Sequence, residues 1–519
     1  MTEGASGRPD EAPATEPSRW KALLLIGLAQ LMVVLDSTVV DVALPSIQRD
    51  LGISDGNRQW VVTAYALAFG GLLLLGGRIA DKWGRRNTFT VGLIGFALAS
   101  ALVGAAGGEA MLLSARALQG AFGAVLAPAA LSLLSVMFTD ARERAKAFGI
   151  YGAIAAGGGA LGLVLGGLLT EYLDWRWAFF VNIPFAIVAA LGARIVIRRE
   201  PAGSRNRARL DIPGVILSTL GLVALVYGFT RAESAGWSDP VTLVLLVAAP
   251  VLLTVFVLVQ TRVPAPLLPP RVLLERNRAG AYLAAGLSVT ALFGLFLFLT
   301  YYFQVVKGYS PVTTGLAFLP MIAGMIVGSA RIGTRLTPRI PPRMLIGPGL
   351  LLAAVGMLLL TGLEAGSSYP ALILPAQILI GLGMGSASMS ATALSTHRID
   401  PADAGVASAM VNSSRQIGAA IGTALLNTIA ASATTAYEAF RAGEGAGAAA
   451  AARTLRTQAL VHGFSTATWW AAGILLVGAA AAFVLINTGR PAARSATPPP
   501  QTEQAPSPKP RSEPARTRC

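Results

Sequence analysis

Cysteine and histidine are almost absent from this chain of 519 residues, which contains one Cys and two His. Cys519 is the last residue, so no disulfide framework is predicted, and two separate histidines give no metal-binding cluster. Charge is also scarce, at 13% of residues against roughly 25% in soluble proteins. Hydrophobic residues make up 54%. This deficit of polar surface indicates an all-α integral membrane protein whose solvent is the lipid bilayer.

Motifs for enzymatic chemistry are missing too. No Ser/His/Asp or Cys/His arrangement typical of an enzyme can be read, and no GxxxxGK[ST] string for ATP is present. We therefore expect neither an enzyme nor an ATP-driven pump, and no cofactor. A non-transporting receptor is disfavoured because the polar segments are loops and short tails, with no folded input domain.

Fourteen stretches are long and apolar enough to cross about 30 Å of hydrocarbon. They lie near residues 22–44, 59–79, 88–106, 110–136, 147–169, 177–198, 212–230, 240–259, 281–304, 315–336, 344–363, 371–395, 404–430 and 465–486.

The net charge of +15 suggests nucleic acid in a soluble protein, but in a membrane protein its meaning depends on position. Lys and Arg concentrate in alternate loops, and the positive-inside rule assigns those loops to the cytoplasm. The sequence thus predicts a multi-pass plasma membrane protein, of bacterial type, with both termini inside and no nucleic-acid partner. The inner loops are at 78–86, 142–146, 194–209, 262–278 and 331–343.

The spans divide into two groups of six with a central pair between them. We expect a disordered cytoplasmic N-terminus, two six-helix bundles, two inserted helices, an Ala-rich outer loop that is helical in part, and a disordered cytoplasmic tail. Their ranges are 1–20, then 21–200 and 271–489 for the bundles, 201–270 for the insert, 431–464 for the loop and 490–519 for the tail. Paired six-helix halves are common in transporters.

Asp36 is the most informative residue, because an acid near the middle of a span costs about 2.5–3.5 kcal/mol to insert. Such a group is suited to carrying a proton, although a structural acid fixed by a neighbour is the alternative. Arg116 in span 4 lies at a similar depth, so the two side chains are close enough to meet. A plain buried salt bridge is the simpler interpretation of that pair. Asp41 lies about 140° around the helix, near the outer interface, and is expected to be structural.

The loop GGRIADKWGRR (76–86) resembles the signature of the major facilitator superfamily between spans 2 and 3. Within that superfamily the chain is similar to the fourteen-span drug:proton antiporters. The resemblance implies a gating hinge, and we expect glycines there to permit tight turns. The matching positions are Gly77, Arg78, Asp81, Gly84, Arg85 and Arg86.

Four further strings resemble motifs of the family. LDSTVVDVALPSI places Asp36 at an acidic position, and RALQGAFGA places Arg116 and Gln119 in register. DWRWAFFVNIP (174–184) and SSRQIGAAIGTAL (413–425) are similar to strings of the fourteen-span group, and the second puts Arg415 and Gln416 near the middle of the membrane. We expect Gln119 and this last pair to line a cavity.

Span 5 carries a glycine stripe that resembles the antiporter motif, except that Leu163 replaces the expected Pro. The stripe is either a hinge or a face for close helix packing, and the missing Pro removes the expected kink. It comprises Gly158, Gly162, Gly166 and Gly167.

Aromatic residues crowd span 9, among them Phe296 and Tyr301. They form either a wall for lipophilic cargo or a core stripe. The resemblance implies a proton-coupled exporter of lipophilic or cationic drugs, with protons and a small-molecule cargo as partners, expected to work as a monomer. An exporter of one natural product, siderophore or peptide on the same fold is the alternative.

Overall fold

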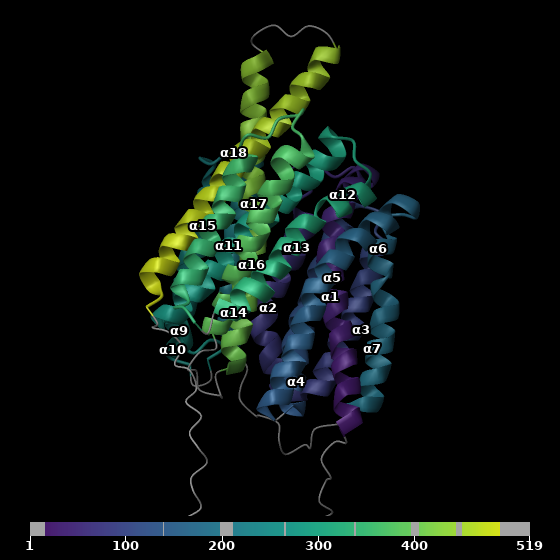
Figure 1. Cartoon of the computed structure of the whole chain (residues 1–519), viewed down its shortest axis with the longest axis vertical. Helices are drawn as coiled ribbons and strands as arrows, with labels where there is room; N and C mark the ends of the chain where they lie inside the picture. Colours follow the sequence, from purple (N-terminus) through teal and green to yellow (C-terminus); the bar gives the residue numbers. More distant parts are fainter. Residues whose placement is uncertain are drawn as a thin grey trace, which may run out of the picture.

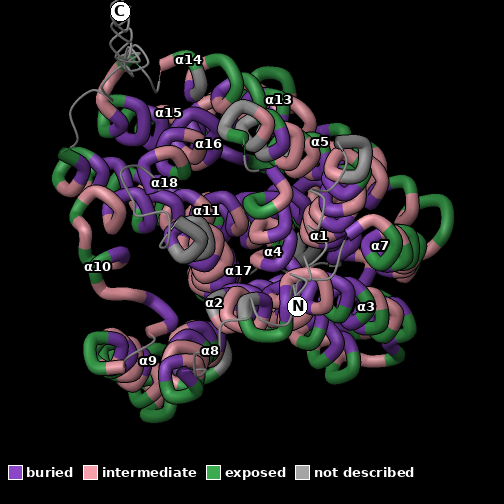
Figure 2. The backbone as a smooth tube through the Cα atoms, turned by 90° about the horizontal axis from the view of Figure 1, so that it is seen from below, coloured by how far each residue is buried: buried purple, intermediate pink, exposed green. Residues whose placement is uncertain are grey.

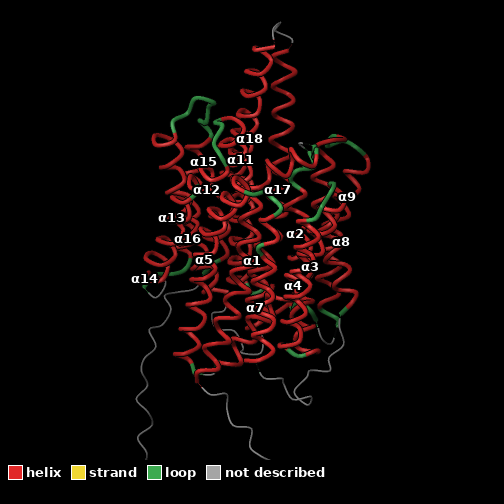
Figure 3. The backbone as a smooth tube through the Cα atoms, turned by 90° about the vertical axis from the view of Figure 1, so that its right-hand side faces the viewer, coloured by secondary structure: helices red, strands yellow, loops and turns green. Residues whose placement is uncertain are grey.

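The computed structural model describes residues 16–54, 56–138, 140–197, 211–263, 266–336, 339–395, 404–442 and 449–487. All regular secondary structure in these residues is helical, and they contain no strand (Figure 3). The predicted N-terminal and C-terminal tails lie almost entirely outside the described residues. The first helix already begins at Glu16, inside the range that the sequence assigned to the N-terminal tail.

Thirteen membrane-crossing segments are long and apolar enough among the described residues, and α2 contributes a shorter apolar stretch, Trp60–Leu73. The predicted number of spans agrees with this count. The helices of the first group are α1 (Glu16–Leu51), α2 (Trp60–Trp83), α3 (Arg85–Gly104), α4 (Glu109–Met137), α5 (Ala141–Tyr172), α6 (Trp177–Phe180) and α7 (Asn182–Val196). The inserted pair is α8 (Ile212–Ala235) and α9 (Pro240–Gln260).

The second group has more interruptions, because three of its spans contain π-helical turns. Its elements are α10 (Pro270–Leu273), α11 (Arg276–Tyr301) with η2 (Tyr302–Val306), α12 (Pro311–Ala317), α13 (Leu319–Val327) with η3 (Gly328–Gly333), α14 (Thr334–Leu336), α15 (Arg343–Leu360), η4 (Tyr369–Ile373), α16 (Leu374–Ser395), α17 (Ala404–Ala442) and α18 (Ala449–Leu485).

The helices assemble in a way that keeps each sequence group together. Helices α1 to α7 pack on one another, and so do α11 to α18 (Figures 1 and 2). The inserted pair lies to one side, where α8 contacts both α2 and α17 (Figure 2). The outward sides of α8 and α9 are exposed and apolar, which suits contact with lipid acyl chains.

The segment 431–464, predicted as a loop that is helical in part, is helical in its described residues. Helix α17 continues to Ala442 and α18 begins at Ala449, so the two form a helical hairpin that projects beyond the bundle (Figure 1). The end of the molecule that carries this hairpin is called the hairpin end below. Helix α1 begins and α18 ends at the opposite end (Figure 1).

Contacts between the two groups gather towards the hairpin end. The backbone N–H of Val312 in α12 donates to Glu171 at the end of α5, at 2.9 Å. Gln304 in η2 donates to the carbonyl of Val42 in α1, at 2.8 Å. Arg58, just before α2, donates to Asn427 of α17 at 3.3 Å. These bonds hold the groups together near that end of the bundle.

The glycine stripe of span 5 has two packing faces. Gly158 and Gly166 lie against α1, where an added Cβ would meet Leu31, Val34 and Val39 at about van der Waals distance or closer. Gly167 faces the other group instead, because its Cβ would lie 2.7 Å from the carbonyl oxygen of Pro311 in α12. Helix α5 itself is one continuous helix past Leu163. The stripe therefore lets α5 approach both groups of helices.

Candidate coupling site in the first helix group

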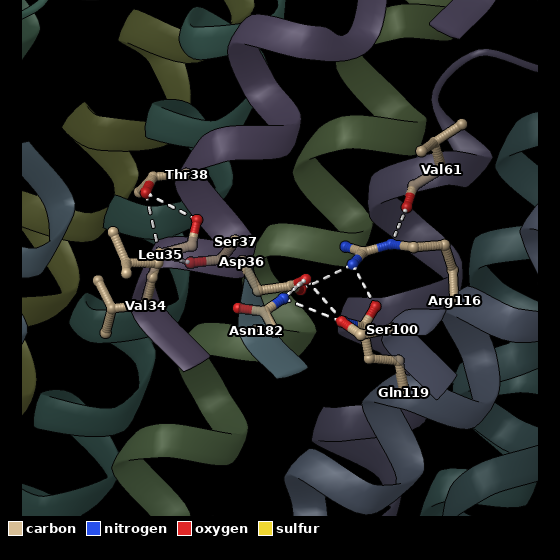
Figure 4. A network of polar contacts seen from close by, with 10 residues as sticks. All are labelled: Val34, Leu35, Asp36, Ser37, Thr38, Val61, Ser100, Arg116, Gln119 and Asn182. Carbon is tan, nitrogen blue, oxygen red and sulfur yellow. Dashed lines mark hydrogen bonds and ion pairs between the residues drawn. The ribbon is translucent and has the colours of Figure 1, made fainter. Parts of the chain in front are cut away.

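Asp36 lies at the centre of a polar network buried inside the first group of helices. The residue is 1% exposed, and its two carboxylate oxygens have different donors (Figure 4). Arg116 donates to Oδ2 at 2.7 Å, while Gln119 and Asn182 donate to Oδ1 at 2.6 and 3.0 Å. The predicted meeting of Asp36 and Arg116 is therefore present, and three donors stabilise the carboxylate.

Arg116 is as deeply buried as its partner, at 1% exposure. Its Nε donates to the carbonyl oxygen of Val61 in α2 at 2.9 Å, and its Nη1 also donates to Gln119 at 2.7 Å. The guanidinium carbon lies 4.4 Å from the centre of the Tyr65 ring, within the range of a cation–π contact. The cation is thus held by groups from α1, α2 and α4.

Ser100 and Asn182 complete the network, and the sequence analysis did not single out either of them. Ser100 of α3 accepts from Gln119 at 2.6 Å and from Asn182 at 2.9 Å (Figure 4). Asn182 stands at the start of α7 in the string DWRWAFFVNIP, so its position within a quoted family motif was the available signal. Gln119 is completely buried in this network, and its amide is occupied by Asp36 and its neighbours.

The arrangement is balanced electrostatically but costly to disturb. One carboxylate and one guanidinium cancel, and each has further hydrogen bonds to satisfy it in a low-dielectric interior. Removing one partner of such a pair typically costs about 3–5 kcal/mol, because the other charge stays buried alone. The network joins five helices: α1, α2, α3, α4 and α7. Neutralising Asp36 by a proton, or by a cationic ligand, therefore changes the free energy of the contacts among these helices.

The signature loop connects three parts of the molecule. Arg78, in the last part of α2, donates to the carbonyl of Pro266 in the segment that follows the inserted pair. Arg86 of α3 donates to the carbonyl oxygen of Arg194 in α7 at 2.6 Å. Arg85 is the first residue of α3 and is half-buried. The side chain of Asp81 is not among those described.

The two glycines of the loop behave differently. Gly84 has a φ of 91°, so it makes the turn between α2 and α3 that the sequence predicted. Gly77 was expected to permit a tight turn as well, and this is wrong: it lies within the continuous helix α2. The close approach falls one residue earlier, where a Cβ on Gly76 would collide with the carbonyl of Ala124 in α4.

The predicted lining residues of the second group do not join the Asp36 network. Arg415 of α17 donates to Ser388 and Thr392 of α16, at 2.6 and 2.9 Å. Gln416 packs against Gly70 of α2.

The aromatic residues of span 9 are core residues in this structure. Phe296 is 6% exposed and its ring centre lies 5.0 Å from that of Phe318. Tyr301 is 5% exposed, lies under the guanidinium of Arg58 and donates its hydroxyl to Gln48 of α1.

The family model of the Major Facilitator Superfamily matches residues 26–423, which include both charged residues of the network and the signature loop. The chain belongs to the Major Facilitator Superfamily. Its fold and its two groups of membrane-spanning helices agree with that membership.

Several relatives within the superfamily carry names that refer to antibiotics. A puromycin resistance protein of Streptomyces alboniger is 54% identical over 480 residues, which cover 92% of this chain and 93% of the relative. A cephamycin export protein of Amycolatopsis lactamdurans is 40% identical, covering 80% of this chain and 85% of the relative. A tetracenomycin C resistance and export protein of Streptomyces glaucescens is 36% identical, covering 80% and 76%.

Among solved structures, a bacterial homologue of the human lysosomal transporter Spinster, crystallised in an inward-facing and occupied conformation, matches with a TM-score of 0.67. It covers 91% of this chain and 97% of its own length at 17% identity. This similarity shows the fold alone.

Proposed function

We propose that this protein exports antibiotic-type small molecules across the bacterial plasma membrane in exchange for protons. The observation that carries the proposal is the buried Asp36–Arg116 pair, at 2.7 Å, inside the helix group of a Major Facilitator Superfamily member. A buried acid in a membrane-spanning helix is expensive, and in transporters such groups mark ion and proton pathways.

Coupling follows from competition for the carboxylate. When Asp36 is charged, it holds Arg116 and, through Gln119 and Asn182, the helices α3, α4 and α7. A proton on Asp36 cancels the attraction to Arg116 and turns one acceptor oxygen into a donor, so the network must rearrange. In this way, binding and release of a proton at Asp36 change how the helices around it are arranged, and the proton gradient drives that change. No cofactor is needed for this cycle.

The orientation that we propose places the hairpin end outside the cell and both termini in the cytoplasm. It rests on the basic loops of the sequence and on the helix ends, since α1 begins and α18 ends opposite the hairpin (Figure 1). With this orientation the bonds between the two groups lie on the outer side, as in a transporter that receives cargo from the cytoplasm. We propose that a single chain carries out the cycle.

One relative suggests a specific cargo: the puromycin resistance protein, which is 54% identical over most of both chains. Puromycin is therefore the first compound to test, followed by cephamycin, tetracenomycin C and a permanently charged cation such as ethidium. Export of puromycin alone would favour the narrow-specificity alternative, and export of the whole panel would favour a multidrug exporter.

The decisive experiment uses inverted membrane vesicles from cells that express the protein. Addition of an energy source that acidifies the vesicle interior should drive puromycin uptake, and collapse of the pH gradient with nigericin should stop it. Vesicles from cells without the protein are the control. Uptake that persists after the gradient is collapsed would contradict proton coupling, and absence of uptake across the panel would contradict drug export.

A further inference from the structure

Arg415 of α17 lies inside a membrane-spanning segment, and its surroundings differ from those of Arg116. It is eleven residues past Ala404, where α17 begins, so it lies about 16 Å along the helix from the end opposite the hairpin. Its Nη2 donates to Ser388 at 2.6 Å and to Thr392 at 2.9 Å, both in α16. Both acceptors are neutral hydroxyl groups. Among the residues that the structure describes, the guanidinium therefore has no counter-charge.

The described helices around this guanidinium are poor in acids. Helix α16 has no charged residue, and the acid that α17 contains, Glu438, is 23 residues from Arg415. The sequences of α11, α13 and α18 contain no acid either. On α2, Asp81 is eleven residues, or about 16 Å along the axis, from Gly70, which packs against α17. In η3, which packs on α16, Arg331 adds a positive charge.

Several donors at this position have no acceptor among the described residues. Both hydrogen bonds of the guanidinium leave from Nη2, so the three N–H groups on Nε and Nη1 remain for another partner. Thr392 donates its own hydroxyl to the carbonyl oxygen of Ser388 at 2.9 Å. The hydroxyl of Ser388, by contrast, accepts from Arg415 and donates to no described residue. A positive charge, three N–H donors and one O–H donor thus lie together.

These donors are accessible rather than enclosed in a packed core. Arg415 and Ser388 are half-buried, and Thr392 is exposed. The reason is the way in which the two helices pack, since α16 packs chiefly on α13 and α15, and α17 packs chiefly on α11, α2 and α18. Arg415 therefore bridges two helices where they do not pack closely on each other, and a ligand can reach the guanidinium.

An oxyanion is the ligand that suits this set of groups. A carboxylate or a phosphate accepts charge-assisted hydrogen bonds from a guanidinium and further bonds from a hydroxyl group. A cationic or apolar ligand would leave Arg415 without a counter-charge inside the membrane, which is costly. The Asp36–Arg116 pair does not offer such a site, because its two charges already cancel.

We propose that Arg415, Ser388 and Thr392 form a binding site for the carboxylate of an anionic cargo, so that anionic antibiotics are a substrate class of this exporter. The proposal rests on the function proposed above and names a substrate class for it. In this site the carboxylate accepts from the guanidinium N–H groups and from the hydroxyl of Ser388, while Thr392 orients the guanidinium. The site lies in the half of the membrane opposite the hairpin, on the side from which cargo is taken up.

The test compares two drugs that differ in this group, since cephamycin carries carboxylates and puromycin has none. Isothermal titration calorimetry measures their binding to purified protein in detergent, without a pH gradient. Arg415→Gln should bind cephamycin at least tenfold more weakly and puromycin within twofold of the unchanged protein. Arg415→Lys keeps the charge and should lose less affinity, and Ser388→Ala should lose about threefold.

The matched control is Arg441→Gln, which removes the same charge from an exposed position at the other end of α17. It should bind both drugs as the unchanged protein does. A lipid headgroup is the second source of an oxyanion, so native mass spectrometry in the presence of phosphatidylglycerol forms a separate arm of the test.

The outcomes separate this inference from the proposed function. Binding of puromycin but not of cephamycin by the unchanged protein would overturn the anion site and leave drug export standing. Equal cephamycin affinity in Arg415→Gln would overturn it too, as would phosphatidylglycerol that Arg415→Gln loses while it keeps cephamycin. If neither drug binds, the proposed function fails and this inference fails with it. Should Arg415→Gln not fold, an unchanged cephamycin affinity in folded Ser388→Ala would contradict the site.

Discussion

The guanidinium carbon of Arg58 lies 4.0 Å from the centre of the Tyr301 ring, and this contact joins the start of the first helix group to α11 of the second. A buried cation–π contact contributes on the order of 2 kcal/mol or more. The hydroxyl of Tyr301 adds a hydrogen bond to Gln48 of α1. One aromatic side chain therefore holds two segments of the first group at the hairpin end.

We expect Tyr301→Leu to open the hairpin end more often, because it removes both contacts at once. Tyr301→Phe keeps the ring and loses only the hydroxyl, so its effect should be smaller. The measurement is labelling of a cysteine introduced as Ser37→Cys, with Cys519→Ser to remove the single native thiol. A membrane-impermeant maleimide added at the hairpin side should label Tyr301→Leu at least threefold faster. Equal labelling in all three backgrounds would show that Tyr301 does not restrain this end.

The Asp36–Arg116 pair gives a prediction that separates stability from transport. Asp36→Asn leaves Arg116 buried without a counter-charge, so we expect thermal stability to fall, by up to about 3–5 kcal/mol, and gradient-driven puromycin uptake to stop. The double variant Asp36→Asn/Arg116→Gln removes both charges and should recover most of the stability. It should not recover transport. Recovery of uptake in the double variant would contradict the role of Asp36 in coupling.

Asn182 supplies a prediction about a residue outside the charged pair. Asn182→Leu removes the donor to Oδ1 of Asp36 and leaves Ser100 with one donor fewer. A hydrogen bond to a charged group is worth about 1.5–3 kcal/mol. We expect transport to slow about tenfold or more while the protein still inserts, measured as initial puromycin uptake in vesicles normalised to protein amount. Asn182→Gln keeps the amide and should lose less, and the same loss in both variants would make the effect one of packing.

The packing of α5 on α1 can be tested at two glycines of one helix. A Cβ at Gly162 would collide with the hydroxyl of Thr38, whereas a Cβ at Gly159 would meet nothing within 4 Å. We expect Gly162→Val to lower stability by about 1–3 kcal/mol through overpacking, and Gly159→Val to have little effect. Thermal unfolding followed by size-exclusion chromatography measures the difference. Similar behaviour of the two variants would mean that α5 adapts to a larger residue on its α1 face.

The acid stability of the inserted pair depends on Asp239, which lies outside the membrane-spanning segments. The hydrogen bond from Arg231 and that from the backbone of Thr242 hold the pKa of Asp239 below its ordinary value of 3.8. A lowered pKa stabilises the folded state above that value, and the contribution is lost as pH falls through the lowered pKa. Asp239→Asn should therefore be less thermostable than the unchanged protein at pH 7. The gap should narrow below about pH 4, and a gap independent of pH would refute this role.

The sequence predicted the pair Asp36–Arg116 because charge in a span is rare and depth follows from counting residues along a helix. It did not predict Asn182 or Ser100, since neutral polar residues are not rare in spans as charges are, and only Asn182 lay within a motif that the sequence analysis quoted. Helix α2 comes close to α4 at Gly76 rather than at Gly77. Which glycine faces α4 depends on how α2 is turned about its own axis, and the sequence does not give that angle. Likewise, the continuation of α17 and α18 past the bundle depends on their packing against each other, which residue composition does not specify.

The position of α8 has a mechanical consequence. Near its middle, Thr219 lies against Gly71 of α2, and near its end the carbonyl of Phe229 accepts a hydrogen bond from Thr428 of α17 at 2.9 Å. Because α8 contacts both helix groups, a rotation of one group against the other would have to shift α8 relative to α2 or to α17. The side chains along α8 would resist that shift.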